Sequence, residues 1–230
     1  VKRKVGFPPA ESSVEAPCPT YPQQSFASVS DEEKGLTLMN KGLPECEAIP
    51  EKDGICLALT LLRCVGWLSR DDFSTRRGHA GPSIATPEAQ CQGLQEFRYS
   101  LFLHGGDWQK NRIWQEAYNH NVKLLGLATC QQKGSLPKEL SFLEIKPEGL
   151  IVSAIKKAEE KEWLVLRVFS LESEAQKAEI KFAKDIVNAY LLNLEEKIQD
   201  HLELTGNGIS FSIKPFQIVT LGIEFKERSA

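Results

Sequence analysis

The densest cluster of side chains that could do chemistry lies in one run, RDDFSTRRGHAGP, at residues 70–82. It contains three arginines, two aspartates and one histidine, and it closes with Gly81 and Pro82. Arginine presents a planar fork of donors that binds carboxylates, phosphates or vicinal sugar hydroxyls through two bonds at once. The run predicts a shaped, ordered loop, with a solvated cluster of surface charges as the alternative. The candidate site residues are Arg70, Asp71, Asp72, Arg76, Arg77 and His79.

A catalytic pair of carboxylates is the second possibility that this run raises. Hydrolysis by two carboxylates needs an acid and a base or nucleophile roughly 5 to 10 Å apart across the substrate. Asp71 and Asp72 are adjacent, so on a strand they would point to opposite faces and could not straddle one bond. We expect a turn in which one aspartate accepts bonds from backbone amides and the other pairs with a nearby arginine.

Other patterns typical of catalysis or metal binding are weak. The four histidines, His79, His104, His120 and His201, are too scattered for a metal site, and we expect structural or surface roles for them. The sequence contains no GxSxG, HExxH, P-loop or GxGxxG motif. The four tryptophans could stack on sugar rings, but their spacing favours core positions.

Cysteine spacing and net charge limit the remaining classes of function. The six cysteines form no CxxC pair, which favours reduced thiols acting as small core residues in a cytoplasmic protein, with disulfides in an exported protein as the alternative. The formal charge of −3 gives no support for binding nucleic acid or anionic lipid. No apolar run reaches the roughly 20 residues of a membrane span, so we expect a soluble protein.

Strand patterns in the first half would position the charged run. Residues 54–68 are apolar on both alternating faces and predict a central strand covered on both sides. Residues 96–104 alternate with a period of two and predict a strand whose Tyr99, Leu101 and Leu103 side is buried. Residues 35–45 predict a short strand and a turn, and residues 107–121 predict a helix capped by Asp107.

The second half reads as a steady series of short strands separated by polar turns. This spacing is typical of an antiparallel sandwich and sets a domain boundary near residue 135. The predicted strands are 140–146, 149–157, 162–170, 177–183, 187–194, 208–214 and 216–225.

Several long motifs resemble those of one enzyme family. In order, GLTLMNKGLPE, LALTLLRCVGWLSRDDFSTRRGHAGP, TPEAQCQG and FRYSLFLHGGDW are similar to the C-terminal region of family 38 glycoside hydrolases, the α-mannosidases and mannosylglycerate hydrolases. The later segments GLIVSAIKKAEEKEWLVLRVFS, LLNLEE and PFQIVTLGIEF resemble the small closing β-sandwich of the same proteins. The likeness runs from about residue 20 to residue 226.

This resemblance implies a mainly β fold and a non-catalytic role for the segment. Residues 1–135 would be the latter part of a galactose-mutarotase-like supersandwich, and residues 138–227 a small antiparallel β-sandwich. In this family an N-terminal barrel on the same polypeptide holds one zinc ion and an aspartate nucleophile, and it cleaves mannosides with retention. The segment would then hold no cofactor or catalytic residue itself, and its parent would be a cytoplasmic glycosidase.

The resemblance also implies a role for the charged run, which would line the rim of the active site or dock the domain onto the barrel. The rival interpretation is a free-standing carbohydrate-binding or protein-interaction β-module. A third, an independent hydrolase that uses Asp71 or Asp72, would require turnover by this chain alone. If the supersandwich is cut, exposed apolar strands should make the isolated chain self-associate.

Overall fold

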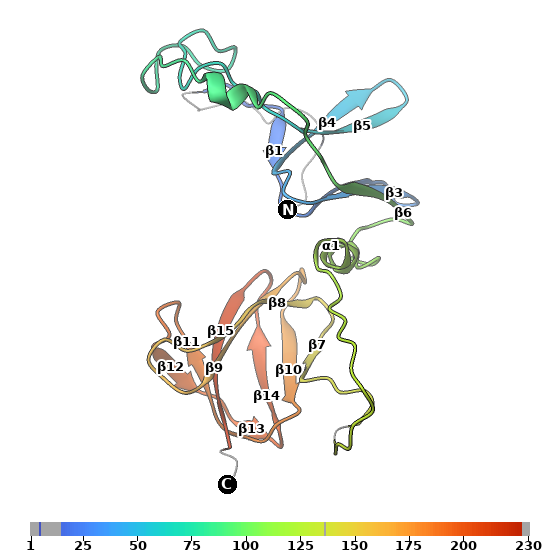
Figure 1. The fold of residues 1–230 in the computed structure, drawn as a ribbon, viewed down its shortest axis with the longest axis vertical. Helices are drawn as coiled ribbons and strands as arrows, with labels where there is room; N and C mark the ends of the chain where they lie inside the picture. Colours follow the sequence, from blue (N-terminus) through green and yellow to red (C-terminus); the bar gives the residue numbers. More distant parts are fainter. Residues whose placement is uncertain (1–4, 6–14, 136, 227–230) are drawn as a thin grey trace. The chain divides into compact units, whose positions relative to one another are not determined.

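The computed structural model describes Val5, residues 15–135 and residues 137–226. The chain divides into two compact units, Val1–Leu127 (unit 1) and Ala128–Ala230 (unit 2), whose elements are drawn in Figure 1. Antiparallel strands make up most of the regular structure in both units, so the predicted mainly β fold is confirmed. The domain ranges 1–135 and 138–227 stay predictions. No helix in the described part of the chain is long and apolar enough to cross a bilayer.

Unit 1 contains two three-stranded antiparallel sheets, with the orders β1-β4-β5 and β2-β3-β6. Its strands are β1 (Thr20–Pro22), β2 (Phe26–Ser30), β3 (Gly35–Asn40), β4 (Glu45–Glu51), β5 (Gly54–Leu59) and β6 (Tyr99–His104). A 3-10 helix, η1 (Pro87–Gln90), lies in the long segment between β5 and β6, and the helix α1 (Ile113–Asn121) follows β6.

The predicted helix at 107–121 is wrong over residues 107–112. Arg112 has a left-handed backbone with φ 49°, and the helix begins only at Ile113. The Asp107 carboxylate accepts a bond from the Gln109 amide at 2.8 Å, so it closes a turn that precedes the helix and does not cap it. Ile113 and Ala117 are fully buried, whereas Tyr118 is exposed.

Helix α1 and the turn before it cover one face of the β2-β3-β6 sheet. The Ser100 hydroxyl lies 3.1 Å from His120 Nδ1, and Phe26 lies 5.7 Å from Trp108 between ring centroids. The Asn121 side chain donates to the Asn40 carbonyl at 3.0 Å. The covered face of β6 is therefore the one that carries Ser100.

This packing reverses the predicted orientation of β6. The period of two was correct, but Tyr99, Leu101 and Leu103 lie on the uncovered face and are 53%, 64% and 80% exposed. The residues between them are the partly covered ones because α1 packs on their side. Alternation alone defines two faces but does not say which of them a later helix will cover.

The predicted buried strand at 54–68 is also wrong. Of this range only Gly54–Leu59 is a strand, and among the described residues it pairs with β4 alone, at the edge of its sheet. Beyond it, the Gln90 side-chain amide donates to the carbonyls of Cys64 and Val65, both at 3.0 Å, so these carbonyls accept from a side chain and not from a neighbouring strand. The apolar side chains in this part, such as Leu61 and Leu62, remain exposed.

Unit 2 is a sandwich of two antiparallel sheets, with the orders β13-β14-β10-β7 and β12-β11-β15-β9-β8. All seven strands expected from the sequence are present, and β12 and β13 are additional. The strands are β7 (Leu143–Lys146), β8 (Leu150–Lys157), β9 (Leu164–Ser170), β10 (Gln176–Phe182), β11 (Ile186–Leu192), β12 (Ile198–His201), β13 (Leu204–Thr205), β14 (Gly208–Ile213) and β15 (Ile218–Phe225).

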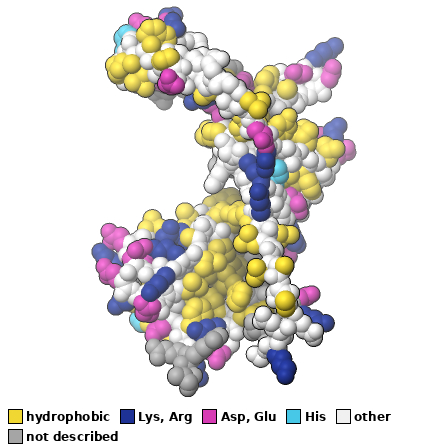
Figure 2. All heavy atoms as spheres, in the orientation of Figure 1, with side chains coloured by type: hydrophobic (Ala, Val, Ile, Leu, Met, Phe, Trp, Pro, Cys, Tyr) yellow, Lys and Arg dark blue, Asp and Glu magenta, His cyan; other side chains and the backbone are white. Residues whose placement is uncertain are grey.

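Both sheets of unit 2 contribute to one apolar core. Ile180 and Ile213 from one sheet and Leu166, Leu221 and Ile223 from the other are fully buried in it. Figure 2 shows hydrophobic side chains gathered in the middle of this unit and charged ones on its outer surface. Burying such side chains is the main favourable term in folding, at about 1.5 to 3 kcal/mol each.

Candidate functional site

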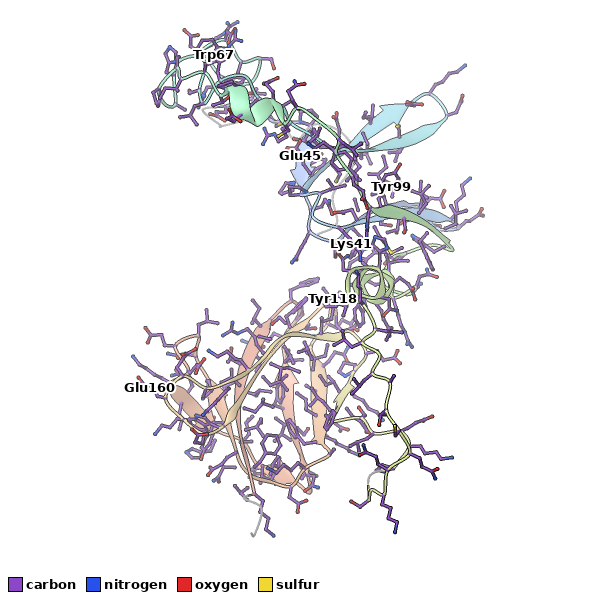
Figure 3. All side chains as sticks on the ribbon, viewed as in Figure 1. Lys41, Glu45, Trp67, Tyr99, Tyr118 and Glu160 are labelled. Carbon is purple, nitrogen blue, oxygen red and sulfur yellow. The ribbon has the colours of Figure 1, made fainter. Side chains whose placement is uncertain are left out.

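The charged run lies on a loop whose base is a short antiparallel ladder. The Leu68 amide donates to the Ile84 carbonyl at 2.8 Å, and the Thr86 amide donates to the Gly66 carbonyl at 3.0 Å. Between these bonds Trp67 and Ala85 form a β-bridge, and Figure 3 labels Trp67 in this part of unit 1. Residues 69–83 thus form a loop whose two ends are held together by this ladder.

A second bridge, between Asp72 and Arg77, narrows the loop above its base. Gly78 follows it with φ +84°, a left-handed conformation that glycine adopts without steric cost. The pattern of charged residues around two glycines therefore folds as the ordered turn that the sequence indicated.

Arg70 and Asp72 form a two-bonded ion pair. Arg70 Nε donates to Asp72 Oδ1 at 2.7 Å, and Arg70 Nη2 donates to Asp72 Oδ2. These bonds to the guanidinium hold the pKa of the Asp72 carboxyl below its usual range. The carboxylate of Asp72 is therefore a fixed ionic partner, not a group poised to exchange a proton.

Asp71 has a different partner. Its Oδ2 lies 3.5 Å from His79 Nε2, and the Ser83 hydroxyl lies 3.3 Å from His79 Nδ1. The predicted pair of an aspartate with a nearby arginine is therefore present at Asp72. Asp71, in contrast, lies beside an imidazole, and in the described part of the chain it does not accept the predicted bonds from backbone amides.

Arg76 is tied to the beginning of the described chain. Its Nη1 lies 3.1 Å from Glu15 Oε1, and the guanidinium lies 5.7 Å from the centre of the Phe73 ring. The Ala16 amide donates to the Thr75 carbonyl at 2.6 Å, which brings the two segments together. Glu15 was not among the predicted residues, because nothing in the local sequence signals a contact over such a separation.

Arg77 is the arginine of the loop that keeps its charge available. Within the described ranges its side chain has no ion pair, and the residue is exposed. Of the six predicted residues, five are therefore engaged by pairs that shape the loop, and Arg77 remains free to bind something else.

The four histidines have local structural partners. His104 Nε2 lies 3.0 Å from the Thr37 hydroxyl, and its ring packs so closely on Gly35 that a Cβ there would lie 2.2 Å from Cε1. His120 contacts Ser100, and the His201 ring lies 4.9 Å from the Tyr190 ring. Among the described residues no three His, Cys, Asp or Glu side chains gather in a way that could hold a metal ion. The zinc ion that the family resemblance implies belongs to the N-terminal barrel, outside this chain, and stays a prediction.

The cysteines and tryptophans depart in part from the expected core positions. Cys46 is buried, but Cys18, Cys56, Cys64, Cys91 and Cys130 are exposed free thiols. Trp163 is buried beside Tyr190, with ring centroids 4.7 Å apart, whereas Trp67 is exposed on the long segment. Most of these exposed cysteines and the exposed tryptophan lie in unit 1. Unit 1 buries fewer of its apolar side chains than unit 2 does.

Comparison with known proteins gives a family for the second half of the chain and similar proteins for most of its length. Residues 149–221 match the domain described as "Glycosyl hydrolases family 38 C-terminal beta sandwich domain". A protein of Halalkalibacterium halodurans named "Putative mannosylglycerate hydrolase" is 30% identical over 201 residues, which are 87% of this chain and 20% of that protein. "Alpha-mannosidase G" of Dictyostelium discoideum is 30% identical over 103 residues, 42% of this chain and 10% of that protein.

A solved structure supports the match. The crystal structure of an α-mannosidase from Enterococcus faecalis V583 shares 30% identity with this chain, with a TM-score of 0.68 over 89% of this chain and 21% of that one. The chain spans about one fifth of the length of the mannosylglycerate hydrolase relative and of this solved structure. The chain therefore carries the C-terminal β-sandwich domain of glycoside hydrolase family 38.

Proposed function

We propose that this chain is the non-catalytic C-terminal β region of an α-mannosidase-like retaining glycoside hydrolase. The observation that carries the proposal is the match of residues 149–221 to a family 38 C-terminal domain. The chain is also similar to about one fifth of a putative mannosylglycerate hydrolase and of a solved α-mannosidase. In this proposal the zinc ion, the aspartate nucleophile and the mannoside substrate belong to a catalytic barrel on the same polypeptide. The β region acts as scaffold for that barrel.

The proposal assigns the charged loop to the rim of the active site. Arg77 is exposed and without an ion pair in the described ranges, and it sits on a loop that two bridges hold in shape. An ordered guanidinium can donate to two neighbouring sugar hydroxyls or to a substrate carboxylate. A residue at the rim must have a hydrogen-bond donor that is free to reach the substrate. The ion pairs of the neighbouring residues keep the loop ordered, so that the guanidinium of Arg77 is held in a defined position.

The assignment of catalysis to another part of the polypeptide is tested with two proteins. Turnover of an aryl α-mannoside in the presence of zinc is measured for the 230-residue chain and for the longer polypeptide that contains it. We expect turnover only by the longer polypeptide. Glycosidase activity of the 230-residue chain would contradict a scaffold role.

The rim role is tested by Arg77→Ala in the longer polypeptide. Loss of a charged hydrogen bond to substrate, worth about 1.5 to 3 kcal/mol, should lower kcat/KM roughly tenfold to a hundredfold while Tm stays unchanged. The control is Arg98→Ala, which removes an exposed arginine that pairs with Glu96 outside the loop. Unchanged kcat/KM for Arg77→Ala would exclude the rim role, and a lowered Tm with unchanged kinetics would favour docking.

A further inference from the structure

Unit 2 has a small pocket on the side of its four-stranded sheet that faces water. The volume of the pocket is about 340 Å³, which lies at the lower end of the range for sites that bind small molecules. It is formed by β7, β10 and the β13–β14 hairpin, which Figure 1 shows in one sheet, and by the segment before β7. The polar residues that line it are Ser141, Glu144, Lys181, Thr205 and Asn207.

The strand register explains why this part of the sheet is hollow. Glu144 of β7, Lys181 of β10 and Gly208 of β14 lie in one cross-strand row, which Thr205 of β13 completes. The preceding residue of β10, Ile180, is buried in the core, so this row lies on the opposite, water-facing side. Because glycine has no side chain, the row is open between its lysine and its threonine. A glycine at such a position allows a ligand to approach the backbone closely.

The two charged groups of the pocket are available to a ligand. Glu144 and Lys181 lie directly opposite each other on adjacent strands, where opposite charges attract. Nevertheless, among the described residues neither side chain forms an ion pair. On the same side of β10, by contrast, Lys177 pairs with Glu179 at 3.0 Å. The pocket therefore offers a free ammonium donor and a free carboxylate acceptor, and together they carry no net charge.

Uncharged groups and an aromatic ring complete the surroundings of the pocket. The hydroxyl of Thr205 can donate and accept, and the side-chain oxygen of Asn207 can accept. Phe142 precedes β7, and its backbone carbonyl accepts from the amide of the lining residue Ala183 at 3.1 Å. The Phe142 side chain is 79% exposed. An aromatic ring thus lies at the surface next to a polar pocket.

We propose that this pocket binds the pyranose ring of a neutral sugar. Each sugar hydroxyl both donates and accepts, so two neighbouring hydroxyls can accept from Lys181 and donate to Glu144 at once. The C–H face of a pyranose is apolar and slightly positive, so it packs on the negative face of an aromatic ring such as that of Phe142. With one cation and one anion, the pocket does not favour an anionic ligand over a neutral one. The site lies wholly within unit 2, so this inference goes beyond the proposed function and does not depend on it.

Saturation-transfer NMR tests the site in the 230-residue chain. The probes are the methyl glycosides of mannose, glucose and galactose, and free glycine represents a zwitterionic ligand. We expect at least one glycoside to bind with a Kd of about 1 to 10 mM, because so small a ligand makes few contacts. Glycine should show no saturation transfer.

Three variants identify where the sugar binds. Lys181→Met keeps the side-chain stem but removes the donors, and Glu144→Gln removes the charge of the acceptor, so each should raise the Kd roughly tenfold. Phe142→Ala removes the ring and should raise the Kd roughly threefold to tenfold. The matched controls are Lys177→Met on the same strand and Phe216→Ala, an exposed aromatic residue before β15. Both controls should leave the Kd unchanged.

Three outcomes would overturn the proposal. The first is the absence of binding by all three glycosides. The second is glycoside binding that both Lys181→Met and Glu144→Gln leave unchanged, because the sugar would then lie elsewhere on the chain. The third is binding of glycine in place of the glycosides, which would assign the pocket to an amino acid.

A thermal melt of each variant separates loss of binding from loss of folding. If either Lys181→Met or Glu144→Gln lowers Tm, the other variant of the two decides the outcome. None of these readouts measures turnover. Activity of the 230-residue chain on an aryl α-mannoside would therefore refute the proposed function and leave this inference intact.

Discussion

Most charged side chains of the 70–82 loop form ion pairs that hold the loop in shape. Arg70 neutralises Asp72, Arg76 reaches Glu15, and His79 lies beside Asp71. Each of these pairs is exposed on at least one side, where water screens the attraction between the charges, so their role is to order the loop more than to stabilise the unit. Of the arginines that could bind a carboxylate, a phosphate or sugar hydroxyls, Arg77 is therefore the one whose guanidinium is available.

A residue-scale prediction concerns Gly208 on β14. A Cβ at this position would lie 2.7 Å from the Ile180 carbonyl oxygen, which is backbone and cannot rotate away. Gly208→Ala should therefore cost about 1 to 3 kcal/mol of the free energy of unfolding of unit 2, measured by urea denaturation. The control is Gly134→Ala, where a Cβ meets no atom within 4 Å. Equal stability of the two variants would contradict this packing.

At the scale of elements, one carboxylate connects two turns of unit 2. The turn after β8 and the turn after β11 are far apart in the sequence. Glu196 Oε1 lies 2.8 Å from Lys156 Nζ, and Glu196 Oε2 accepts from the Glu159 amide at 2.9 Å. This link holds together two turns that otherwise have mainly their own backbone bonds.

The Glu196 link should make the stability of unit 2 depend on pH. Its bonds to Lys156 and to the Glu159 amide lower the pKa of Glu196 from 4.5. A carboxyl with a lower pKa in the folded state stabilises fully above its unfolded pKa, and that contribution is lost as the pH falls through the folded value. Glu196→Gln should therefore lower Tm at neutral pH and reduce the further loss of Tm between about pH 5 and pH 3.

A thermal melt series over that pH range measures the effect. The control is Glu162→Gln, since Glu162 pairs only with the neighbouring strand residue Lys157 at 2.6 Å and joins no second turn. If the Tm of the wild type and that of Glu196→Gln fall equally with decreasing pH, the Glu196 link does not contribute to the pH dependence of stability.

At the scale of the whole molecule, the two units differ in how far they bury their apolar residues. Unit 2 surrounds its core with two sheets, whereas unit 1 leaves Tyr99, Leu101 and Leu103 of β6 and much of the 60–98 segment exposed. An apolar surface with an open sheet edge favours association between copies. We propose that the isolated chain self-associates through the exposed Tyr99, Leu101 and Leu103 side of β6 when the rest of the longer polypeptide is absent.

Light scattering tests this self-association over a range of protein concentrations. The apparent mass of the isolated chain should rise with concentration, and the double variant Leu101→Thr, Leu103→Thr should shift this rise to higher concentration about tenfold or more. Ile155→Thr in unit 2 should leave the curve unchanged. A wild-type chain that stays monomeric throughout would contradict the prediction.

The sequence by itself determined the fold class, the seven main strands of unit 2 and the turn at residues 70–82, because alternation, turn residues and charge are local patterns. The tertiary structure alone decided which face of β6 is covered, where the strand beginning at Gly54 ends and which charges of the loop are paired. These features depend on partners distant in the chain: α1 packs on the Ser100 side of β6, and Glu15 reaches Arg76. Local periodicity defines the faces of a strand, but only the packing of other elements determines which face is buried.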